Sequence, residues 1–112
     1  MNKGFLLGYS YEGRMRRILG SSGEVGLGGK TFDGLYGNKL YEAKYRDFWQ
    51  GTAMKDIDFW TNKFEKLNSI ATQNGKLFEV ITEGSLPQVF KDHFSSAGIL
   101  FRENLLSWDM SL

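Results

Sequence analysis

The sequence predicts an α/β fold in which a mixed sheet is flanked by helices. Three segments carry apolar residues at helical spacing, and residues 77–82 (LFEVIT) have the β-branched and aromatic content typical of a strand. Between residues 31–36 and 39–45, the dipeptide Gly37-Asn38 indicates a tight hairpin, which supplies an antiparallel pair. We expect the strands that follow helices to complete a mixed sheet.

The composition describes one folded domain over residues 1–112. Apolar residues make up 41% of the chain and aromatic residues 15%, which excludes a disordered chain. At 112 residues the chain can bury a core but is too short for two domains. Lysine and arginine (14) nearly balance aspartate and glutamate (13), and a net charge of +1 is not a nucleic-acid-binding signature.

The chain contains no cysteine, which excludes disulfides, thiolate metal sites and cysteine nucleophiles. Its single histidine, His93, excludes most histidine-rich zinc sites and is assigned no role of its own. No apolar run approaches the ~18 residues of a membrane span, and the short apolar start is unlike a signal peptide. We expect a soluble piece of a longer protein, with no membrane span.

The first helix is expected over residues 9–19, followed by a glycine-rich segment. Its apolar face consists of Tyr11, Met15 and Ile18. Residues 20–23 (GSSG) end the helix, and residues 24–29 (EVGLGG) are expected to hold a short strand and a turn.

Residues 26–31 (GLGGKT) look like part of a phosphate-binding loop, but the spacing is wrong. That motif needs a glycine where Glu24 stands, and it needs a helix to begin at Lys30-Thr31. Residues 32–34 read as strand instead. We therefore reject a nucleotide-binding loop and assign the glycines to tight turns and close backbone approach.

The clearest helix of the chain follows the hairpin and ends at residues 74–75 (NG). Its apolar stripe consists of Ala53, Ile57, Trp60, Phe64, Leu67 and Ala71. Residues 77–82 then form the strand already described.

A shorter helix and a last strand complete the expected order. Ser85 is expected to cap a helix that carries Pro87 in its first turn and reaches Ser96. A glycine ends this helix, and residues 99–101 form the last strand. Residues 105–108 are apolar enough to dock on the fold.

The two-residue turn at 37–38 fixes the register of the hairpin. Residues 34–36 pair with residues 39–41, so Asp33 lies directly opposite Glu42. Side chains alternate along a strand, so these two carboxylates point to the same face of the sheet.

Two opposed carboxylates are an electrostatic conflict. At ~5 Å and an effective dielectric constant of ~20 the repulsion is roughly 3 kcal/mol, whereas a good cross-strand pair contributes only ~0.2–1 kcal/mol. A divalent cation between Asp33 and Glu42 would compensate for the repulsion. Two other readings stay open: Lys44, which shares the face of Glu42, neutralises the pair, or the register slips and Asp33 is a turn residue.

Other polar residues gather around this hairpin. Glu12 has Arg16 at i+4, so a surface ion pair is expected unless the first helix packs on the hairpin and brings a third carboxylate to the metal. Gln73, at the end of the long helix, is either solvated or a contact to a substrate. Basic residues cluster early in the chain and around the acid pair, where they usually form a solvated face: Arg14, Arg16, Arg17, Lys39, Lys44 and Arg46.

This arrangement resembles the PD-(D/E)xK, or restriction-endonuclease-like, nuclease superfamily. The expected element order is similar to that superfamily's αβββαβ core over nearly the whole chain. Asp33 matches its metal-binding Asp, and Glu42 and Lys44 match the two ends of (D/E)xK. Glu12 matches the helical glutamate of many members. Phe32 stands where the motif has proline.

The resemblance implies a nuclease that hydrolyses phosphodiester bonds of DNA or RNA. Asp33, Glu42 and the carbonyl group of Ala43 would hold Mg²⁺ or Mn²⁺, since those ions prefer oxygen ligands. The ion would polarise the phosphoryl oxygen and activate a water, and Lys44 would orient that water or stabilise the developing charge. Three arginines would grip flanking phosphates: Arg14, Arg17 and Arg46.

The small size of the chain, with no DNA-reading domain, resembles the toxin domains of bacterial contact-dependent inhibition and polymorphic toxin systems. That resemblance implies the C-terminal piece of a larger secreted protein, which acts in the target-cell cytoplasm and is neutralised by a cognate immunity protein. Two alternatives stay open. One is a non-catalytic nucleic-acid- or protein-binding module on a nuclease-like fold, and the other is a repair or phage nuclease without an immunity partner.

Overall fold

The computed structural model describes the backbone of residues 3–105 and the side chains of residues 10–105. This part of the chain contains five helical segments and six strands. In order, they are α1 (Lys3–Leu19), β1 (Val25–Leu27), β2 (Lys30–Phe32), β3 (Gly34–Tyr36), β4 (Lys39–Lys44), α2 (Arg46–Gly51), the 3-10 helix η1 (Ala53–Lys55), α3 (Ile57–Gln73), β5 (Leu77–Thr82), α4 (Gln88–Ala97) and β6 (Leu100–Arg102).

A four-stranded mixed sheet in the order β3-β4-β5-β6 forms the centre of the molecule. β3 runs antiparallel to β4, whereas β4, β5 and β6 run parallel to one another. β1 and β2 form a separate two-stranded sheet. The α/β class with a mixed sheet flanked by helices, predicted from the sequence, is therefore confirmed.

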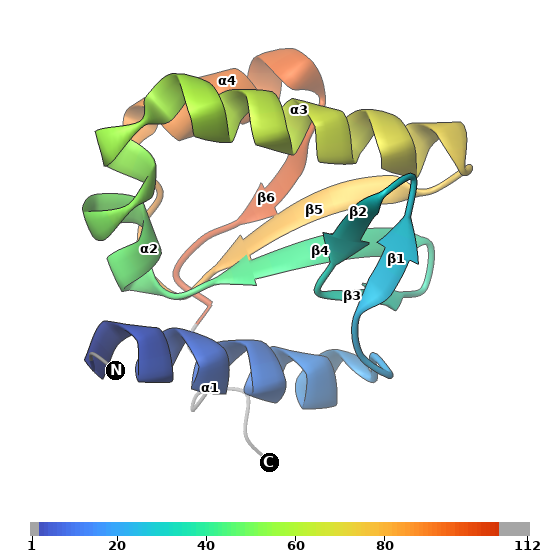
Figure 1. The fold of residues 1–112 in the computed structure, drawn as a ribbon, viewed down its shortest axis with the longest axis horizontal. Coiled ribbons are helices and arrows are strands. Elements are labelled where there is room, and N and C mark those ends of the chain that lie inside the picture. Colours follow the sequence, from blue (N-terminus) through green and yellow to red (C-terminus); the bar gives the residue numbers. More distant parts are fainter. Residues whose placement is uncertain (1–2, 106–112) are drawn as a thin grey trace.

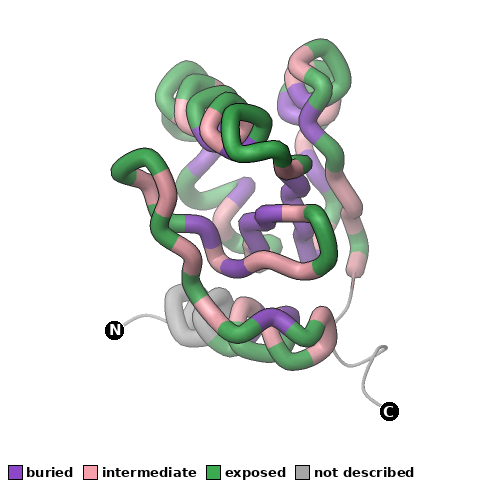
Figure 2. The backbone as a smooth tube through the Cα atoms, turned by 90° about the vertical axis from the view of Figure 1, so that its right-hand side faces the viewer, coloured by how far each residue is buried: buried purple, intermediate pink, exposed green. Residues whose placement is uncertain are grey.

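Helices cover both faces of the central sheet. α3 and α4 lie on one face and α1 lies on the other, while α2 sits beyond the C-terminal end of β4 (Figure 1). β4 shows how alternation divides the core: Leu40 packs on the α3 side, and Tyr41 and Ala43 pack on the α1 side. Figure 2 shows that buried residues gather on the strands and on the helix segments turned toward them.

The two cores differ in size because two helices cover one face and a single helix covers the other. The larger core consists of Phe32, Leu40, Trp49, Ala53, Phe64, Leu67, Ala71, Phe78, Val80, Leu86, Phe90, Phe94 and Ile99. The smaller core consists of Tyr11, Met15, Tyr41, Ala43 and Ile81. Leu105 packs against the smaller core, and the backbone carbonyl of this residue accepts a 2.8 Å hydrogen bond from the Tyr11 hydroxyl. The rest of the tail expected to dock, residues 106–108, lies outside the described residues.

The predicted hairpin register is confirmed. Gly34 pairs with Tyr41, and Tyr36 pairs with Lys39 on either side of the turn. Only Gly37 of the two turn residues has a positive φ, +55°, which is the pattern of a tight turn with glycine at its first central position.

Several predicted boundaries were wrong. α1 begins at Lys3, well before residue 9, and the glycine-rich segment forms the turn of a complete β1–β2 hairpin. α2 and η1 were not predicted. Ala53, which was expected in the long helix, lies buried in η1 instead, and α3 begins only at Ile57. β5 covers residues 77–82, as predicted.

Ser85 does not cap α4. That helix begins at Gln88, directly after Pro87, and the Ser85 hydroxyl instead donates a 3.1 Å hydrogen bond to the side chain of Asn104. The last strand is shifted by one residue, to 100–102. Within the described residues, none of the helices is both long enough and apolar enough to span a membrane.

Candidate functional site

The candidate site lies at the edge of the sheet, where β3 stops and β4 continues. β3 begins at Gly34, opposite Tyr41, so Glu42, Ala43 and Lys44 extend past the end of their neighbour. On the other side these three residues pair with β5. The parallel pairing with β5 therefore holds one edge of this part of β4, and the opposite edge faces Asp33 instead of a strand.

Asp33 is bound to the edge of β4 through both its backbone and its side chain. Its N–H donates a 3.0 Å hydrogen bond to the carbonyl of Tyr41, and its Oδ2 accepts a 2.8 Å hydrogen bond from the N–H of Ala43. The carboxylate thus takes the place of the next strand partner. Because the N–H and C=O of one strand residue point to the same side, the Ala43 carbonyl faces the same edge.

Glu42 is a buried carboxylate, only 6% exposed, on the face of β4 that also carries Leu40 and looks toward α3. Burial raises its pKa well above the ordinary value of 4.5, Lys44 acts in the opposite direction, and Asp33 raises the pKa further through its charge and through hydrogen bonding. The raised pKa favours the protonated form of Glu42 beside Asp33 when no cation is bound.

Glu42 differs from the other buried carboxylates in its counter-ion. Glu83 accepts two hydrogen bonds from Arg46, at 2.8 and 2.7 Å, and Glu79 pairs with Arg102 at 3.0 Å. The nearest cation to Glu42 is the Lys44 ammonium, whose Nζ lies 3.9 Å from Oε2. Glu42 therefore has a longer ion pair than Glu79 and Glu83 have, and its partner is a lysine rather than an arginine.

Aromatic rings surround the Lys44 ammonium. Its Nζ lies 4.8 Å from the centre of the Phe48 ring and 5.9 Å from that of Trp60. Lys63 also lies over the Trp60 indole, with Nζ 4.9 Å from the ring centre, and its charge lowers the pKa of Glu42. The ion pair between Lys44 and Glu42 is what the reading in which Lys44 neutralises the acid pair predicts, so that reading stays open.

Glu12 is brought to the site by α1. Burial, followed by the charge of Asp33, raises the pKa of Glu12 from 4.5 to about 7, while Lys44 and Arg16 act in the opposite direction. α1 packs on β4 of the hairpin, because Tyr11 and Met15 share the smaller core with Tyr41 and Ala43. The packing that was the condition for a role of Glu12 is therefore present, but α1 covers the face of β4 opposite to the one that carries Glu42.

Glu12, Asp33 and Glu42 do not converge tightly. Among the described side chains, no group of three histidine, cysteine, aspartate or glutamate residues is placed to hold one metal ion. The oxygen donors that do meet at the edge are two carboxylates, of Asp33 and Glu42, and the backbone of Ala43. This donor set suits a hard divalent cation that keeps several water ligands.

The three predicted phosphate-binding arginines have different surroundings. Arg14 and Arg17 lie exposed on α1, one turn apart. Arg46 is also exposed, but two of its guanidinium nitrogens are bound to Glu83. Arg46 therefore has less capacity than the other two to grip a phosphate.

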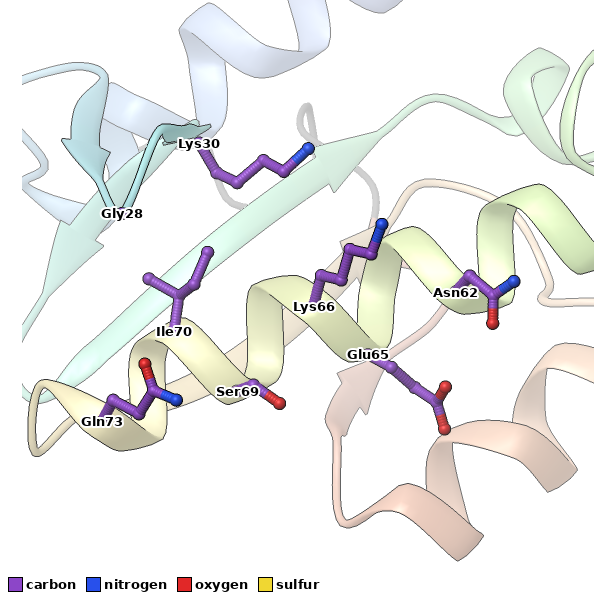
Figure 3. A pocket seen from close by; sticks show the side chains of 8 residues that line it. All are labelled: Gly28, Lys30, Asn62, Glu65, Lys66, Ser69, Ile70 and Gln73. Atoms are coloured by element: carbon purple, nitrogen blue, oxygen red, sulfur yellow. The ribbon is translucent and has the colours of Figure 1, made fainter.

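A pocket that the sequence did not predict lies between the β1–β2 turn and α3 (Figure 3). It has a volume of about 460 Å³ and is lined by Gly28, Lys30, Asn62, Glu65, Lys66, Ser69, Ile70 and Gln73. Gln73 had been considered as a substrate contact, and Lys30 only as part of the rejected phosphate-binding loop. Only the i, i+3 spacing of Lys63 and Lys66 on α3 marked them as neighbours.

His93 lies on α4, and its Nε2 is 3.9 Å from a carboxylate oxygen of Glu65, one of the residues that line the pocket. No protein family, curated protein or solved structure matches this chain.

Proposed function

We propose that this chain is a metal-dependent nuclease that hydrolyses phosphodiester bonds, built on a restriction-endonuclease-like αβββαβ core. The observation that carries the proposal is the charge deficit at Glu42. This buried carboxylate has Asp33 near it, and its ion pair with the Lys44 ammonium is long, at 3.9 Å. Glu83 and Glu79 instead form hydrogen-bonded ion pairs with arginines, at 2.7 and 3.0 Å. A divalent cation is the charge that would complete the site.

The donor atoms fit Mg²⁺ or Mn²⁺. Asp33, Glu42 and the carbonyl of Ala43 would supply oxygen ligands from the chain, and water would supply the rest. When bound, such an ion polarises a phosphoryl oxygen and lowers the pKa of a coordinated water. The β3–β4 register supports this ligand set, because it leaves the edge of β4 open beside Asp33.

The remaining site residues supply charge and proton transfer. The Lys44 ammonium would stabilise the negative charge that develops on the phosphoryl oxygens, and the rings of Phe48 and Trp60 hold it in position. Glu12, with a pKa of about 7, is suited to accept a proton from the attacking water near neutral pH. Arg14 and Arg17 would bind phosphates farther along the substrate.

The biological setting we propose is that of a bacterial toxin domain. The 112 residues form one compact module, and the candidate site lies at its sheet edge. Such a domain would be delivered as part of a larger protein, act in the target-cell cytoplasm and be neutralised by an immunity protein. A small neighbouring open reading frame whose product binds the domain tightly would separate a toxin from a repair or phage nuclease.

Cleavage assays test the proposal directly. The purified chain is incubated with plasmid DNA and with tRNA, in Mg²⁺, in Mn²⁺ and in EDTA. We expect cleavage of at least one substrate with a divalent cation, and none in EDTA or with Asp33→Asn. If neither substrate is cut with either ion, the enzyme reading fails and the non-catalytic binding module becomes the better account.

A further inference from the structure

The pocket between the β1–β2 turn and α3 has one wall from each element. Gly28 closes the turn against the helix, because a β-carbon there would lie 3.2 Å from side-chain atoms of Ile70. Figure 3 shows Lys30 and Lys66 extending from opposite walls toward the C-terminal end of β4, the end that carries Glu42. Lys30 and Lys66 therefore extend toward the end of β4 that carries the candidate site.

Lysine ammonium groups lie between the pocket and Glu42. Lys63 lies one turn before Lys66 on α3, and its charge reaches Glu42. Trp60 has the ammonium groups of Lys63 and Lys44 at 4.9 and 5.9 Å from its ring. Four lysines thus mark a path from the pocket to Glu42, and they are Lys30, Lys66, Lys63 and Lys44.

Most of these amines are free to bind an anion. Within residues 10–105, no carboxylate lies at ion-pairing distance from Lys30, Lys63 or Lys66. The pocket also offers hydrogen-bonding groups of another kind, from the side chains of Asn62 and Gln73. Amines bind phosphate charge, and amide side chains hydrogen-bond to the polar edge of a base. A nucleotide is a ligand that carries both features.

We propose that this pocket holds one unpaired nucleotide of a single-stranded nucleic acid, adjacent to the scissile phosphate. Lys30 and Lys66 bind its phosphate, and Asn62 and Gln73 face its base or sugar. This assignment rests on the proposed nuclease function for its place next to a reacting phosphate.

The size of the pocket suits one nucleotide rather than a base-paired duplex. Its volume is about 460 Å³, and most of the residues that line it are exposed, so a ligand can enter from the surface. Only an unstacked nucleotide presents itself in that form, because the bases of a duplex remain stacked and paired.

Binding measured without cleavage tests this pocket separately from the chemistry. We would follow the fluorescence anisotropy of a labelled single-stranded oligonucleotide in EDTA, as DNA and as RNA. Lys30→Ala and Lys66→Ala should each weaken binding about fourfold at physiological salt and lower the salt slope by about 0.7, the effect of losing one phosphate contact. Lys91→Ala is the matched control, since that lysine lies on α4 and pairs with Glu103 at 3.0 Å.

The outcomes separate the two proposals. Cleavage by the wild type together with unchanged affinity and salt slope in the Lys30→Ala, Lys66→Ala double variant would overturn the pocket and leave the nuclease intact. Lysine-dependent binding without cleavage under any divalent cation would support the pocket and refute the hydrolysis. Equal affinity for the oligonucleotide and its duplex would overturn the single-strand assignment. Thermal melts of each variant confirm that it is folded.

Discussion

The Oδ2 atom of Asp33 lies 2.8 Å from the backbone nitrogen of Ala43 and accepts its hydrogen bond. Asp33 therefore has two roles, because one carboxylate satisfies a backbone donor and also sits beside Glu42. The two roles are separable by substitution, because an amide retains an oxygen acceptor but carries no charge.

Asp33→Ala and Asp33→Asn should differ in stability but not in activity. Alanine leaves the Ala43 N–H without its acceptor, so the free energy of unfolding should fall by about 1–3 kcal/mol. Asparagine keeps an acceptor and removes the repulsion with Glu42, so its stability should stay close to that of the wild type. Both variants should lose about a hundredfold or more in cleavage rate. Urea denaturation and plasmid cleavage measure the two effects, and an active asparagine variant would remove Asp33 from the metal site.

Glu42→Gln should lose the stabilisation that Mg²⁺ gives to the wild type. An ion that binds only the folded state adds about 2.7 kcal/mol at a concentration of a hundred times Kd, which raises the melting temperature. Without the ion, the glutamine variant should melt higher than the wild type at alkaline pH, because a buried carboxylate short of positive charge has been removed.

The matched control for that experiment is Asp92→Asn. Asp92 is an exposed residue of α4 that accepts a 2.8 Å hydrogen bond from Gln88, which asparagine can also accept. This variant should keep the full Mg²⁺ shift in thermal melts. A shift of equal size in Glu42→Gln would show that the ion binds elsewhere.

Glu12→Gln should reduce the dependence of stability on pH. The folded pKa of Glu12, about 7, lies above the ordinary 4.5, so the folded chain holds this proton more tightly than the unfolded chain does. The resulting stability is fully present below pH 4.5 and is lost as the pH rises through about 7. Allowing for partial exposure, the loss should be on the order of 1–2 kcal/mol. Denaturation in EDTA across this window should give a flatter curve for the variant, and parallel curves would contradict the raised pKa.

Lys44→Met should reduce cleavage about 10²–10³-fold without removing the Mg²⁺ shift in melting temperature. Methionine fills the space between Phe48 and Trp60 but has no charge for the reacting phosphate. Lys44→Arg keeps the charge and should retain part of the activity. Single-turnover cleavage together with thermal melts separates a loss of chemistry from a loss of metal binding.

Gly34→Ala should destabilise the fold by about 1–3 kcal/mol. A β-carbon at this position would lie 2.1 Å from Oγ of Ser21 and 2.8 Å from Cε1 of Tyr41, so the hairpin would have to move away from the smaller core. Gly13→Ala is the control, because nothing lies within 4 Å of a β-carbon there. In the helix α1 that substitution should stabilise by about 0.5–1 kcal/mol. Equal melting temperatures for the two variants would contradict the close approach at Gly34.

The hairpin was predictable because its information is local. A glycine with positive φ fixes a two-residue turn, and the turn sets the register from Tyr36–Lys39 to Gly34–Tyr41 without any knowledge of the rest of the fold. Whether Glu12 comes close to Asp33 depends on how α1 packs against the sheet, so the sequence could predict it only on the condition of that packing.

Features that depend on tertiary packing were missed. α2 is a six-residue helix whose Trp49 is held by the larger core and by a 2.7 Å hydrogen bond to Thr82, and no periodicity shows in so short a segment. The hydrogen bond from Ala43 to Asp33 requires β3 to stop at Gly34, and the pocket requires the β1–β2 turn to reach α3. The spacing of apolar residues encodes neither where β3 ends nor how far the β1–β2 turn reaches.

The short length of β3 has a further consequence for how the molecule meets other chains. A strand that ends early leaves donors and acceptors of its neighbour exposed, and such an edge invites the addition of a foreign strand. Here the open donor of β4 is already bound to Asp33, and the negative charge of that residue discourages an incoming backbone carbonyl. Asp33 therefore also protects this edge of the sheet from edge-to-edge aggregation.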